Sequence, residues 1–579
     1  MAAITGRYDI FEYDVLVLGA GGAGLRAAIA ASEAGSRVAV VCKSLLGKAH
    51  TVMAEGGIAA SLGNVDPADN WQVHFADTMR GGQMINNWRM VELFAKEVPQ
   101  RVLELERWGA LFDRTPEGYI SQRPFGAHTY RRLCHVGDRT GLELIRTLQD
   151  RAVASDVDVF MEHTLTRLLT DDGHIAGAFG YRREDGRLFL IRAKAVIIAS
   201  GGFGKIFKVT SNSWEGTGDG VAMAYEAGAA LRDMEMVQFH PTGMVWPPGV
   251  RGILVTEAVR GEGGLLYNSE NERFMLRYDP QKKELSSRDV VARSIYKEVQ
   301  AGRGSEHGGA YLDIRHRGAE YIKRKLPSMY EQFLRLADVD ITKERMEVAP
   351  TVHYAMGGID VEADTAATRI PGLYAAGEAA AGLHGANRLG GNSLGDLLVF
   401  GKRAGEAAAA YARTIPKLPI LDDGQVEAER QLLMRPFESN GEENPYLFHE
   451  ELQQVMAEHA GIARTEDGLR EGLQKILALR ERAKNLHIGG SLMFNPGWHS
   501  ARDDLFMLTI CEAILRCAIE RRESRGAHWR LDYENKDPAQ GTINFITYKS
   551  DGAMVVEGRP IPPLPRELAE LLEESERHD

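Results

Sequence analysis

Runs of apolar residues that each end in a glycine turn occur at three distant places along the chain. The first run, YDVLVLG at residues 13–19, is followed by an alanine-rich, helix-competent stretch at 23–34 and a second apolar run, RVAVV, at 37–41. This order predicts a βαβ unit near the start of the chain. Similar buried-strand patterns occur at 195–200 (AVIIAS) and 373–376 (LYAA). Together they predict one nucleotide-binding sheet interrupted by an inserted domain.

The remaining pattern changes in character along the chain. Residues 231–350 mix strand-like and helical segments, as expected of the inserted domain. From 425 to 525, leucine and isoleucine recur at helical spacing among charged residues, which is typical of a helix bundle. Prolines between 560 and 565 precede an acidic tail, which indicates extended chain followed by a short exposed helix.

The glycine motif GAGGAG at 19–24 lies between a predicted strand and a predicted helix. Glycines at this point allow backbone N–H groups to approach a pyrophosphate at the helix N-terminus. The motif alone is weak evidence, but its place between two strands favours a dinucleotide site over a merely tight turn. The acid expected about twenty residues further on is replaced by Cys42, Lys43 and Ser44. The ribose contact must therefore be made differently, and a simple NAD site is less favoured.

Composition and charge exclude several classes of protein. At 579 residues the chain is several times the usual length of one domain. A net charge of -12 without a long basic run speaks against a nucleic-acid binder. The four cysteines have no C-x-x-C spacing, so we expect buried thiols and no disulfide framework or iron–sulfur site on this chain. No secretory signal and no run of about 18 apolar residues occurs, so any membrane contact is expected through other subunits.

Two loop motifs carry candidate chemistry. The segment AHTVMAEGG at 49–57 contains His50, although a lone loop histidine is more often a solvated or capping residue. The segment RPFG at 123–126 contains Phe125, for which simple core packing is the ordinary interpretation. Further motifs follow in the order FHPTG (239–243), TE (256–257), RGEGG (260–264), SRD (287–289), PTVHYAMGG (350–358) and ANRLG (386–390).

These motifs, in this order, resemble those of the flavoprotein subunit of succinate dehydrogenase and fumarate reductase over nearly the whole chain. The resemblance implies FAD joined covalently to His50, hydride exchange between flavin and a four-carbon dicarboxylate, and electron transfer to a separate iron–sulfur subunit. Ala49 stands where the family usually has Ser. Glu55 stands where dehydrogenases of the family commonly carry Gln and fumarate reductases Glu.

The resemblance also implies roles for individual residues. Arg288 resembles the family's proton-transfer residue, and Glu257 and Arg260 its relay to solvent; a structural ion-pair network is the alternative. The two carboxylates of a dicarboxylate need guanidinium, imidazole and hydroxyl donors. The expected substrate contacts are Phe125, His240, Thr256, His353 and Arg388. The expected cofactor contacts are Gly19, Gly21, Gly22, Gly24, Lys43, Ser44, His50, Thr51, Gly56, Gly57, Asp219, Glu378, Ser393 and Leu394; no metal ligand is expected.

The fold class that we expect is α/β, with a Rossmann-like FAD-binding domain, an inserted capping domain, a helical domain and a C-terminal extension. The expected boundaries are 1–230 and 351–412 for the FAD-binding domain, 231–350 for the capping domain, 413–530 for the helical domain and 531–579 for the C-terminal domain.

The expected partners are an iron–sulfur subunit, membrane anchor subunits with a quinone, and succinate or fumarate. The expected location is the cytoplasmic face of the cell membrane. Three alternatives stay open besides a non-catalytic role, such as nucleotide sensing or assembly, which would not need His240, His353, Arg288 and Arg388 together. Fumarate reduction is the first, as the physiological direction. L-Aspartate oxidase with non-covalent FAD is the second, and the HTV segment at His50 argues against it. A soluble fumarate reductase is the third, but it would need an attached electron-carrying domain that the sequence does not show.

Overall fold

A mixed seven-stranded sheet carries the glycine turns that the sequence predicted. In the computed structural model, which describes residues 8–576, β1 (Asp9–Leu18) lies between the parallel strands β2 (Val38–Val41) and β9 (Leu188–Ile198). β16 (Leu373–Ala375) also pairs with β9 in parallel. The three strands that end in glycine turns are therefore neighbours, which confirms the predicted nucleotide-binding sheet.

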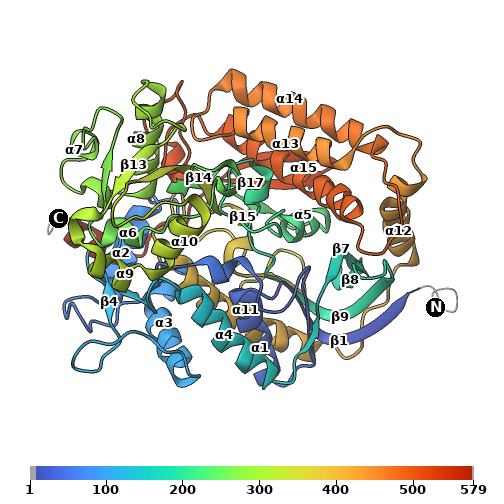
Figure 1. Cartoon of the computed structure of the whole chain (residues 1–579). Helices are drawn as coiled ribbons and strands as arrows, with labels where there is room; N and C mark the ends of the chain where they lie inside the picture. The colour runs from blue at the N-terminus through green and yellow to red at the C-terminus, as the bar shows by residue number, and fades with distance from the viewer. Residues whose placement is uncertain (1–7, 577–579) are drawn as a thin grey trace.

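The sheet extends on both sides of this centre. β6 (Asp158–Phe160) lies beyond β2, and the antiparallel strands β8 (His174–Arg182) and β7 (His163–Asp171) lie beyond β9. Helices α1 (Gly22–Glu33) and α11 (Asn392–Thr414) pack together along one side of the sheet (Figure 1). Because parallel strands are covered by helices, the central strands are nearly continuous apolar runs.

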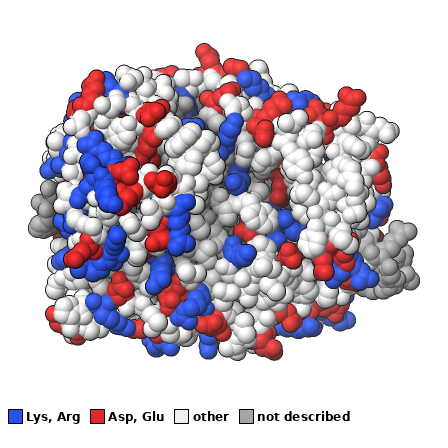
Figure 2. All heavy atoms as spheres, in the orientation of Figure 1, with Lys and Arg blue, Asp and Glu red and all other residues white. Residues whose placement is uncertain are grey.

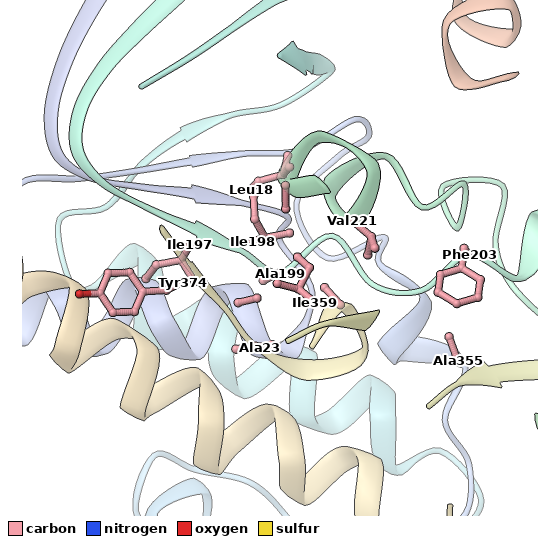
Figure 3. Packing of buried hydrophobic residues seen from close by; sticks show 14 of the residues in the cluster. Leu18, Ala23, Ile197, Ile198, Ala199, Phe203, Val221, Ala355, Ile359 and Tyr374 are labelled. Atoms are coloured by element: carbon pink, nitrogen blue, oxygen red, sulfur yellow. The ribbon is translucent and has the colours of Figure 1, made fainter. Parts of the chain in front are cut away.

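The core of this unit is densest where the parallel strands end. Leu18 of β1, Ile198 of β9 and Tyr374 of β16 are buried in one cluster. Figure 3 shows Leu18, Ile198 and the adjacent Ala199 close together, with Ala23 of α1 nearby. Small alanine side chains allow the first turn of α1 to approach the strand ends closely. The turn between β1 and α1 is therefore held by packing on several sides.

Between β2 and β6 the chain forms helices and a small antiparallel sheet with the strand order β3-β5-β4. Residues next to this sheet in the chain line the candidate site. The elements of this segment are α2 (Trp71–Gly81), α3 (Trp88–Arg107), α4 (Thr140–Val153), β3 (Ile58–Ala59), β4 (Gln122–Arg123) and β5 (Leu133–Cys134).

Between β9 and β16 the chain builds a second unit with its own hydrophobic core (Figure 1, green, at the left). Its central sheet has the strand order β11-β14-β13-β12. β14 runs through residue 350, where the sequence placed a domain boundary. The elements of this unit are β11 (Val237–Met244), α6 (Ala258–Gly261), β12 (Leu265–Tyr267), α7 (Met275–Tyr278), α8 (Arg288–Gln300), β13 (Ala310–Asp313), α9 (Ala319–Lys325), α10 (Pro327–Ala337) and β14 (Met346–Ala355). The same part of the chain also contains α5 (Asp219–Glu226), β10 (Leu231–Arg232) and β15 (Gly358–Ile359), whose buried residues belong to the core of the first unit.

The charged, leucine-containing segment forms helices, as the sequence predicted. Leu469, Ile476 and Leu479 of α14 are buried. Figure 1 shows α13, α14 and α15 side by side at one end of the molecule. The helices are α12 (Asp423–Glu438), α13 (Pro445–His459), α14 (Glu466–Arg482) and α15 (Pro496–Glu520).

The C-terminal segment is more ordered than the sequence indicated. β17 (Ile543–Ser550) and β18 (Ala553–Pro560) form a hairpin, and β17 also pairs with β10. The hairpin turns at Asp551 and Gly552, both of which have positive φ. An Asp-Gly pair is a hairpin signal in the sequence, but the prediction for this segment used only its prolines. The predicted short helix is present as α16 (Arg566–Glu576).

Charges of both signs are interspersed over the molecular face drawn in Figure 2, which is hollowed near its centre. All four cysteines are buried and none forms a disulfide. No helix within residues 8–576 combines the length and the apolar character that crossing a bilayer requires.

Two glycines allow α1 and α11 to pack closely. A Cβ atom at Gly405 would lie 2.3 Å from the Ala27 carbonyl oxygen, and one at Gly401 would lie 2.7 Å from the Ala23 carbonyl oxygen. Both distances are far below van der Waals contact. The backbone of α1 therefore lies directly against α11, and any side chain at these positions must push the two helices apart.

We predict that Gly405→Ala destabilises the protein. Alanine in place of a helical glycine ordinarily stabilises by about 0.4–1 kcal/mol, but here the overpacking should lower the free energy of unfolding by about 1–3 kcal/mol. The urea midpoint followed by circular dichroism checks this. Ala410→Gly, on the exposed side of the same helix, should cost about 1 kcal/mol from helix propensity alone. A Gly405→Ala protein more stable than the unaltered chain would contradict the prediction.

Candidate active site

A large cavity, of about 1220 Å³ including space open to solvent, lies at the carboxyl ends of β1, β9 and β16. Gly19 begins the turn after β1 with φ +109°, and a Cβ atom there would lie 2.3 Å from the Ala199 carbonyl oxygen. A Cβ atom at Gly24 would lie 1.9 Å from the Gly19 carbonyl oxygen, so Gly24 serves the close packing of turn and helix and does not line the cavity.

Most residues that the sequence assigned to the cofactor line this cavity. Gly56 and Gly57 line a smaller adjoining cavity instead. The residues that line the large cavity are Gly19, Gly21, Gly22, Lys43, Ser44, His50, Thr51, Asp219, Glu378, Ser393 and Leu394.

Lys43 joins the cofactor turn to the helical unit. Its Nζ lies 2.6 Å from Oδ1 of Asp503 on α15, 3.1 Å from Oδ2 of Asp219 and 3.0 Å from Oγ1 of Thr217. Burial opposes the charge, but the two carboxylates outweigh it, so the pKa of Lys43 is raised. The ammonium group is thus paired with protein carboxylates, a role that the sequence did not indicate.

One ring nitrogen of His50 is already bonded. The backbone N–H of Ser213 donates to His50 Nδ1 at 3.3 Å, which leaves Nε2 for a ligand in the cavity. Burial, followed by the charges of Arg388 and Lys205, lowers the pKa of His50 to about 4. The histidine is therefore neutral at physiological pH, as a nucleophilic attachment point requires.

Residues in the first turn of α11 line both cavities. The helix begins at Asn392 after Gly391, so the N–H groups of Ser393 and Leu394 belong to its unsatisfied first turn. Glu378 lies across from them, and its Oε1 accepts a 3.0 Å hydrogen bond from the N–H of Ala355. Burial raises the pKa of Glu378 to about 7 in spite of that bond.

The smaller cavity, of about 410 Å³, shares part of its lining with the large one. The structure brings eleven predicted site residues together around it, while Arg260 does not line it. These eleven are Gly56, Gly57, Phe125, His240, Thr256, Glu257, Arg288, His353, Arg388, Ser393 and Leu394. His353, Arg388, Ser393 and Leu394 line both cavities, so a ligand in one directly adjoins a ligand in the other.

Phe125 is held between two glycines. Cβ atoms at Gly56 and Gly390 would lie 2.6 Å and 2.3 Å from atoms of its ring. The ring is almost fully buried, with 4% of its residue surface exposed, and it faces the smaller cavity. Its position therefore depends on the absence of side chains on both flanking segments.

The two histidines of the smaller cavity are neutral. Burial, followed by the charge of Arg288, holds the pKa of His240 well below its usual value. The pKa of His353 is lowered in the same way, by burial and then by His240. Ser211 Oγ lies 2.8 Å from His353 Nδ1. If Ser211 donates this hydrogen bond, His353 Nε2 carries the proton and can donate to an anion.

A continuous chain of charged groups leads away from the smaller cavity. Arg288 Nε donates to Glu257 Oε2 at 2.8 Å, and Arg260 Nη2 lies 3.6 Å from the same oxygen. Burial raises the pKa of Glu257, but the charges of Arg288 and Arg260 lower it by more. The pKa of Glu257 therefore lies below its usual value. The backbone N–H of Gly126 also donates to Glu257 at 2.8 Å. Glu257 is therefore an ionised link between two guanidinium groups.

The direct contacts of the Arg388 guanidinium group are with neutral groups. Its Nη1 donates to Ser393 Oγ at 2.7 Å, its Nη2 donates to Gln238 Oε1 at 3.3 Å, and its guanidinium group lies 4.3 Å from the centre of the Tyr354 ring. Burial, followed by Arg288, lowers the pKa of Arg388 to about 9. This cation therefore has no carboxylate among its hydrogen-bond partners in residues 8–576.

Sequence reasoning missed several residues of the site. Gln238 precedes the FHPTG motif and Tyr354 follows His353, so adjacency to a motif is the signal that could have found them. Ser211 and Ser213 lie in a loop without periodicity. No pattern in the sequence could have assigned them, because their roles depend on tertiary contacts, of Ser211 with His353 and of Ser213 with His50.

The cavity fits FAD. The glycine turn at the start of α1, the available His50 Nε2 and the first turn of α11 supply the groups that a dinucleotide with an isoalloxazine ring needs. A family model described as FAD binding domain matches residues 14–394, and one described as fumarate reductase flavoprotein C-term matches residues 449–561. The chain is an FAD-dependent oxidoreductase.

Similarity to known proteins narrows the class of oxidoreductase to which the chain belongs. The chain is 46% identical to a subunit of the fumarate reductase (CoM/CoB) of Methanothermobacter marburgensis over 92% of this chain and 96% of that protein. It is 38% identical to the succinate dehydrogenase flavoprotein subunit of Coxiella burnetii over 96% of this chain and 97% of that protein. Among solved structures, Mycobacterium smegmatis Sdh1 has a TM-score of 0.90 at 55% identity, covering 98% of each chain.

A variant of E. coli quinol fumarate reductase FrdA has a TM-score of 0.91 at 35% identity and covers 96% of this chain and 98% of that one. The chain belongs to the family of succinate dehydrogenase and fumarate reductase flavoprotein subunits. The expected α/β fold class with its FAD-binding domain is thereby confirmed.

A buried histidine supports the segment that carries Arg388. His74 is fully buried on α2, and its Nε2 lies 3.0 Å from Oδ1 of Asn392 at the start of α11. Burial, followed by the charge of Arg132, holds the pKa of His74 well below 6.5. Below about pH 6.5 the unfolded chain binds a proton here and the folded chain does not. The free energy of unfolding therefore falls as the pH falls below that value.

We predict that His74→Gln makes the stability less sensitive to acid. Between about pH 6.5 and 5, the loss of unfolding free energy should be smaller by up to about 1.4 kcal/mol per pH unit, the contribution of one proton. Urea unfolding at several pH values measures the slope. His174→Gln, at an exposed position, is the control and should leave the slope unchanged. A slope in His74→Gln equal to that of the unaltered protein would count against the buried neutral histidine.

Proposed function

We propose that the chain is the catalytic subunit that interconverts succinate and fumarate and passes electrons to a separate iron–sulfur subunit. The observation that carries this proposal is the arrangement of Arg288, Glu257 and Arg260 as one charged chain that reaches a cavity adjoining the flavin cavity. Bound FAD supplies a two-electron acceptor or donor of hydride. The residues of the smaller cavity then orient the dicarboxylate and move the proton.

Arginine, histidine and threonine side chains would hold the two carboxylates. Arg388 offers a cation without a carboxylate partner, and His240 and His353 are neutral imidazoles that donate one hydrogen bond each. Thr256 is buried beside them with its hydroxyl oxygen accepting from the N–H of Ala258 at 3.3 Å. Phe125 covers the cavity and excludes water from it.

Arg288 would transfer the proton. Its Nε is bonded to Glu257 and its Nη1 to Gln238, while no described residue accepts from Nη2, which leaves that atom for the substrate carbon. Glu257 and Arg260 would return the proton to Arg288 after each turnover. Because the two guanidinium groups share one carboxylate, a proton lost at Arg288 would be replaced through Glu257 rather than by bulk water.

Covalent attachment of the flavin through His50 is part of this proposal. The bond from the Ser213 N–H to Nδ1 supports it, because a histidine substituted at Nε2 still accepts that bond. The relatives differ in name between fumarate reductase and succinate dehydrogenase, so the physiological direction is left open.

Glu55 lines the smaller cavity, and burial, followed by Asp138, raises its pKa well above the usual range.

Exposed apolar residues support the proposal that a partner protein accepts the electrons. Leu45 and Met53 line the flavin cavity and are 43% and 44% exposed, and Trp214, 49% exposed, lies between two further lining residues. Leu142, 52% exposed, is adjacent to Gly141, where a Cβ atom would lie 2.0 Å from the Thr51 carbonyl oxygen. Large apolar side chains at the mouth of a redox cavity favour a docked protein there. We propose that the iron–sulfur subunit covers this surface and that anchor subunits with a quinone hold the complex at the cytoplasmic face of the membrane.

We predict that Arg288→Gln lowers kcat for succinate by about 10²–10⁴-fold, the contribution of a positioned proton donor. Binding of malonate, a non-reacting dicarboxylate, should weaken less than about tenfold, since the clamp residues are retained. Succinate-dependent dye reduction and calorimetry measure the two effects. Arg335→Gln, which removes an exposed cation on α10, is the control for net charge.

A variant Arg288→Gln that keeps more than a tenth of the activity would remove Arg288 from the proton path. An unaltered protein that oxidises L-aspartate and neither oxidises succinate nor reduces fumarate would establish the aspartate oxidase alternative instead.

We predict that flavin stays with the protein after acid precipitation and that His50→Ser releases it. Covalent flavin remains in the pellet, whereas non-covalent flavin passes into the supernatant. Absorbance of the two fractions near the flavin maximum measures the division. Release of flavin from both proteins would exclude the covalent bond at His50 and would again favour an L-aspartate oxidase.

A further inference from the structure

Gln238 lies between the two arginines that face the smaller cavity. Its side chain is fully buried on β11. Arg288 Nη1 donates to its Oε1 at 3.2 Å, and Arg388 Nη2 donates to the same oxygen at 3.3 Å. Two guanidinium groups from segments a hundred residues apart in sequence are therefore held by one neutral acceptor atom.

The orientation of the Gln238 amide follows from its other contacts. Asn387 Nδ2 donates to Asp289 Oδ1 at 3.0 Å, so the Oδ1 atom of Asn387 faces Gln238. Gln238 Nε2 donates to that Oδ1 at 2.8 Å and to the Arg388 carbonyl oxygen at 2.8 Å. With both amide hydrogens engaged there, Oε1 must face the arginines, which can only donate. The hydrogen-bond network thus allows one orientation of the amide.

The position of Gln238 along the strand is also irregular. The pairing of β11 with β14 shifts register between Gln238 and Phe239, where a regular strand would keep alternating faces. Irregularities of this kind re-aim a side chain and are frequent next to active sites. The strand is therefore locally adjusted at the residue that contacts both arginines.

Two neighbouring buried cations repel each other, and a shared acceptor offsets that repulsion. Arg288 lowers the pKa of Arg388, second only to burial. A carboxylate at the place of Gln238 would pair with both groups and use up the positive charge that an anionic substrate needs. An amide oxygen holds the guanidinium groups in position and leaves both charges in place.

We propose that Gln238 is a positioning residue that sets the placement of Arg288 relative to Arg388, and so aligns the proton-transfer arginine with a dicarboxylate held by the clamp arginine. This inference rests on the proposed function. Gln238 does not itself contact the substrate in this proposal, since its four polar contacts are all with protein groups.

A matched control is available elsewhere in the chain. Asn544 is another buried amide, whose Nδ2 donates to the Ile85 carbonyl oxygen and to Asp233 Oδ2. It shares no hydrogen-bond partner with either arginine. Asn544→Leu removes a buried amide by the same kind of isosteric change as Gln238→Met, and it reports what loss of a merely structural amide does to the enzyme.

The experiment compares Gln238→Met, Gln238→Glu and Asn544→Leu as flavin-loaded proteins. Succinate-dependent dye reduction gives kcat and KM, titration calorimetry with malonate gives a dissociation constant without turnover, and circular dichroism verifies folding. Gln238→Met should lower kcat about 100-fold, since a misplacement of about 1 Å has that effect, and should raise the malonate dissociation constant less than about fivefold. Gln238→Glu should raise that dissociation constant at least about tenfold, because a carboxylate beside the arginines repels the dianion. Asn544→Leu should change neither quantity more than about twofold, since it touches neither arginine.

The outcomes separate the two proposals. A folded Gln238→Met that keeps kcat within threefold, or a Gln238→Glu that binds malonate like Asn544→Leu, would overturn the positioning role. An unaltered protein that turns over neither succinate nor fumarate would overturn the proposed function. In that case the malonate titrations still decide whether Gln238 holds the two arginines for an anionic ligand.

Discussion

The burial of three guanidinium groups around one small cavity is the constraint on which the site depends. Arg260, Arg288 and Arg388 are each less than 8% exposed. Within residues 8–576, Glu257 is the one carboxylate that forms an ion pair with any of them. A buried charge without a partner is costly, so the site is completed only when an anion enters it. The positive charge that would bind a dicarboxylate in the proposed function is thus held in the folded protein by neutral contacts, among them those with Gln238.

The same cations determine the state of the histidines. His240 and His353 lie with their ring centres 5.1 Å apart, and burial together with the neighbouring arginines lowers both pKa values. They are therefore neutral and able to donate hydrogen bonds, and the proposed function assigns the proton chemistry to Arg288. A histidine as the acid would compete with the arginines for charge in a cavity that already holds an excess of positive charge.

The fold brings the flavin to this charged cavity by interrupting one sheet. β9 leads out of the sheet into the inserted unit and β16 returns to it, so the strand ends of the FAD-binding unit and the residues of the insertion meet. The first turn of α11 then carries Ser393 and Leu394 to both cavities. The close packing of α1 on α11 through Gly405 fixes this helix against the cofactor turn.

The sequence by itself predicted the parallel sheet and the glycine turns, because these depend on local patterns: apolar runs of strand length and glycines at turns. Its family motifs also pointed to many of the residues that line the two cavities, but not to all of them. It did not determine the C-terminal hairpin, although Asp551 and Gly552 mark its turn. Only the tertiary structure decided that Lys43 pairs with Asp503 and that Gln238 joins Arg288 to Arg388. Those contacts join segments far apart in the chain, and a buried polar group is assigned a partner by three-dimensional packing, which leaves no periodic signal in the sequence.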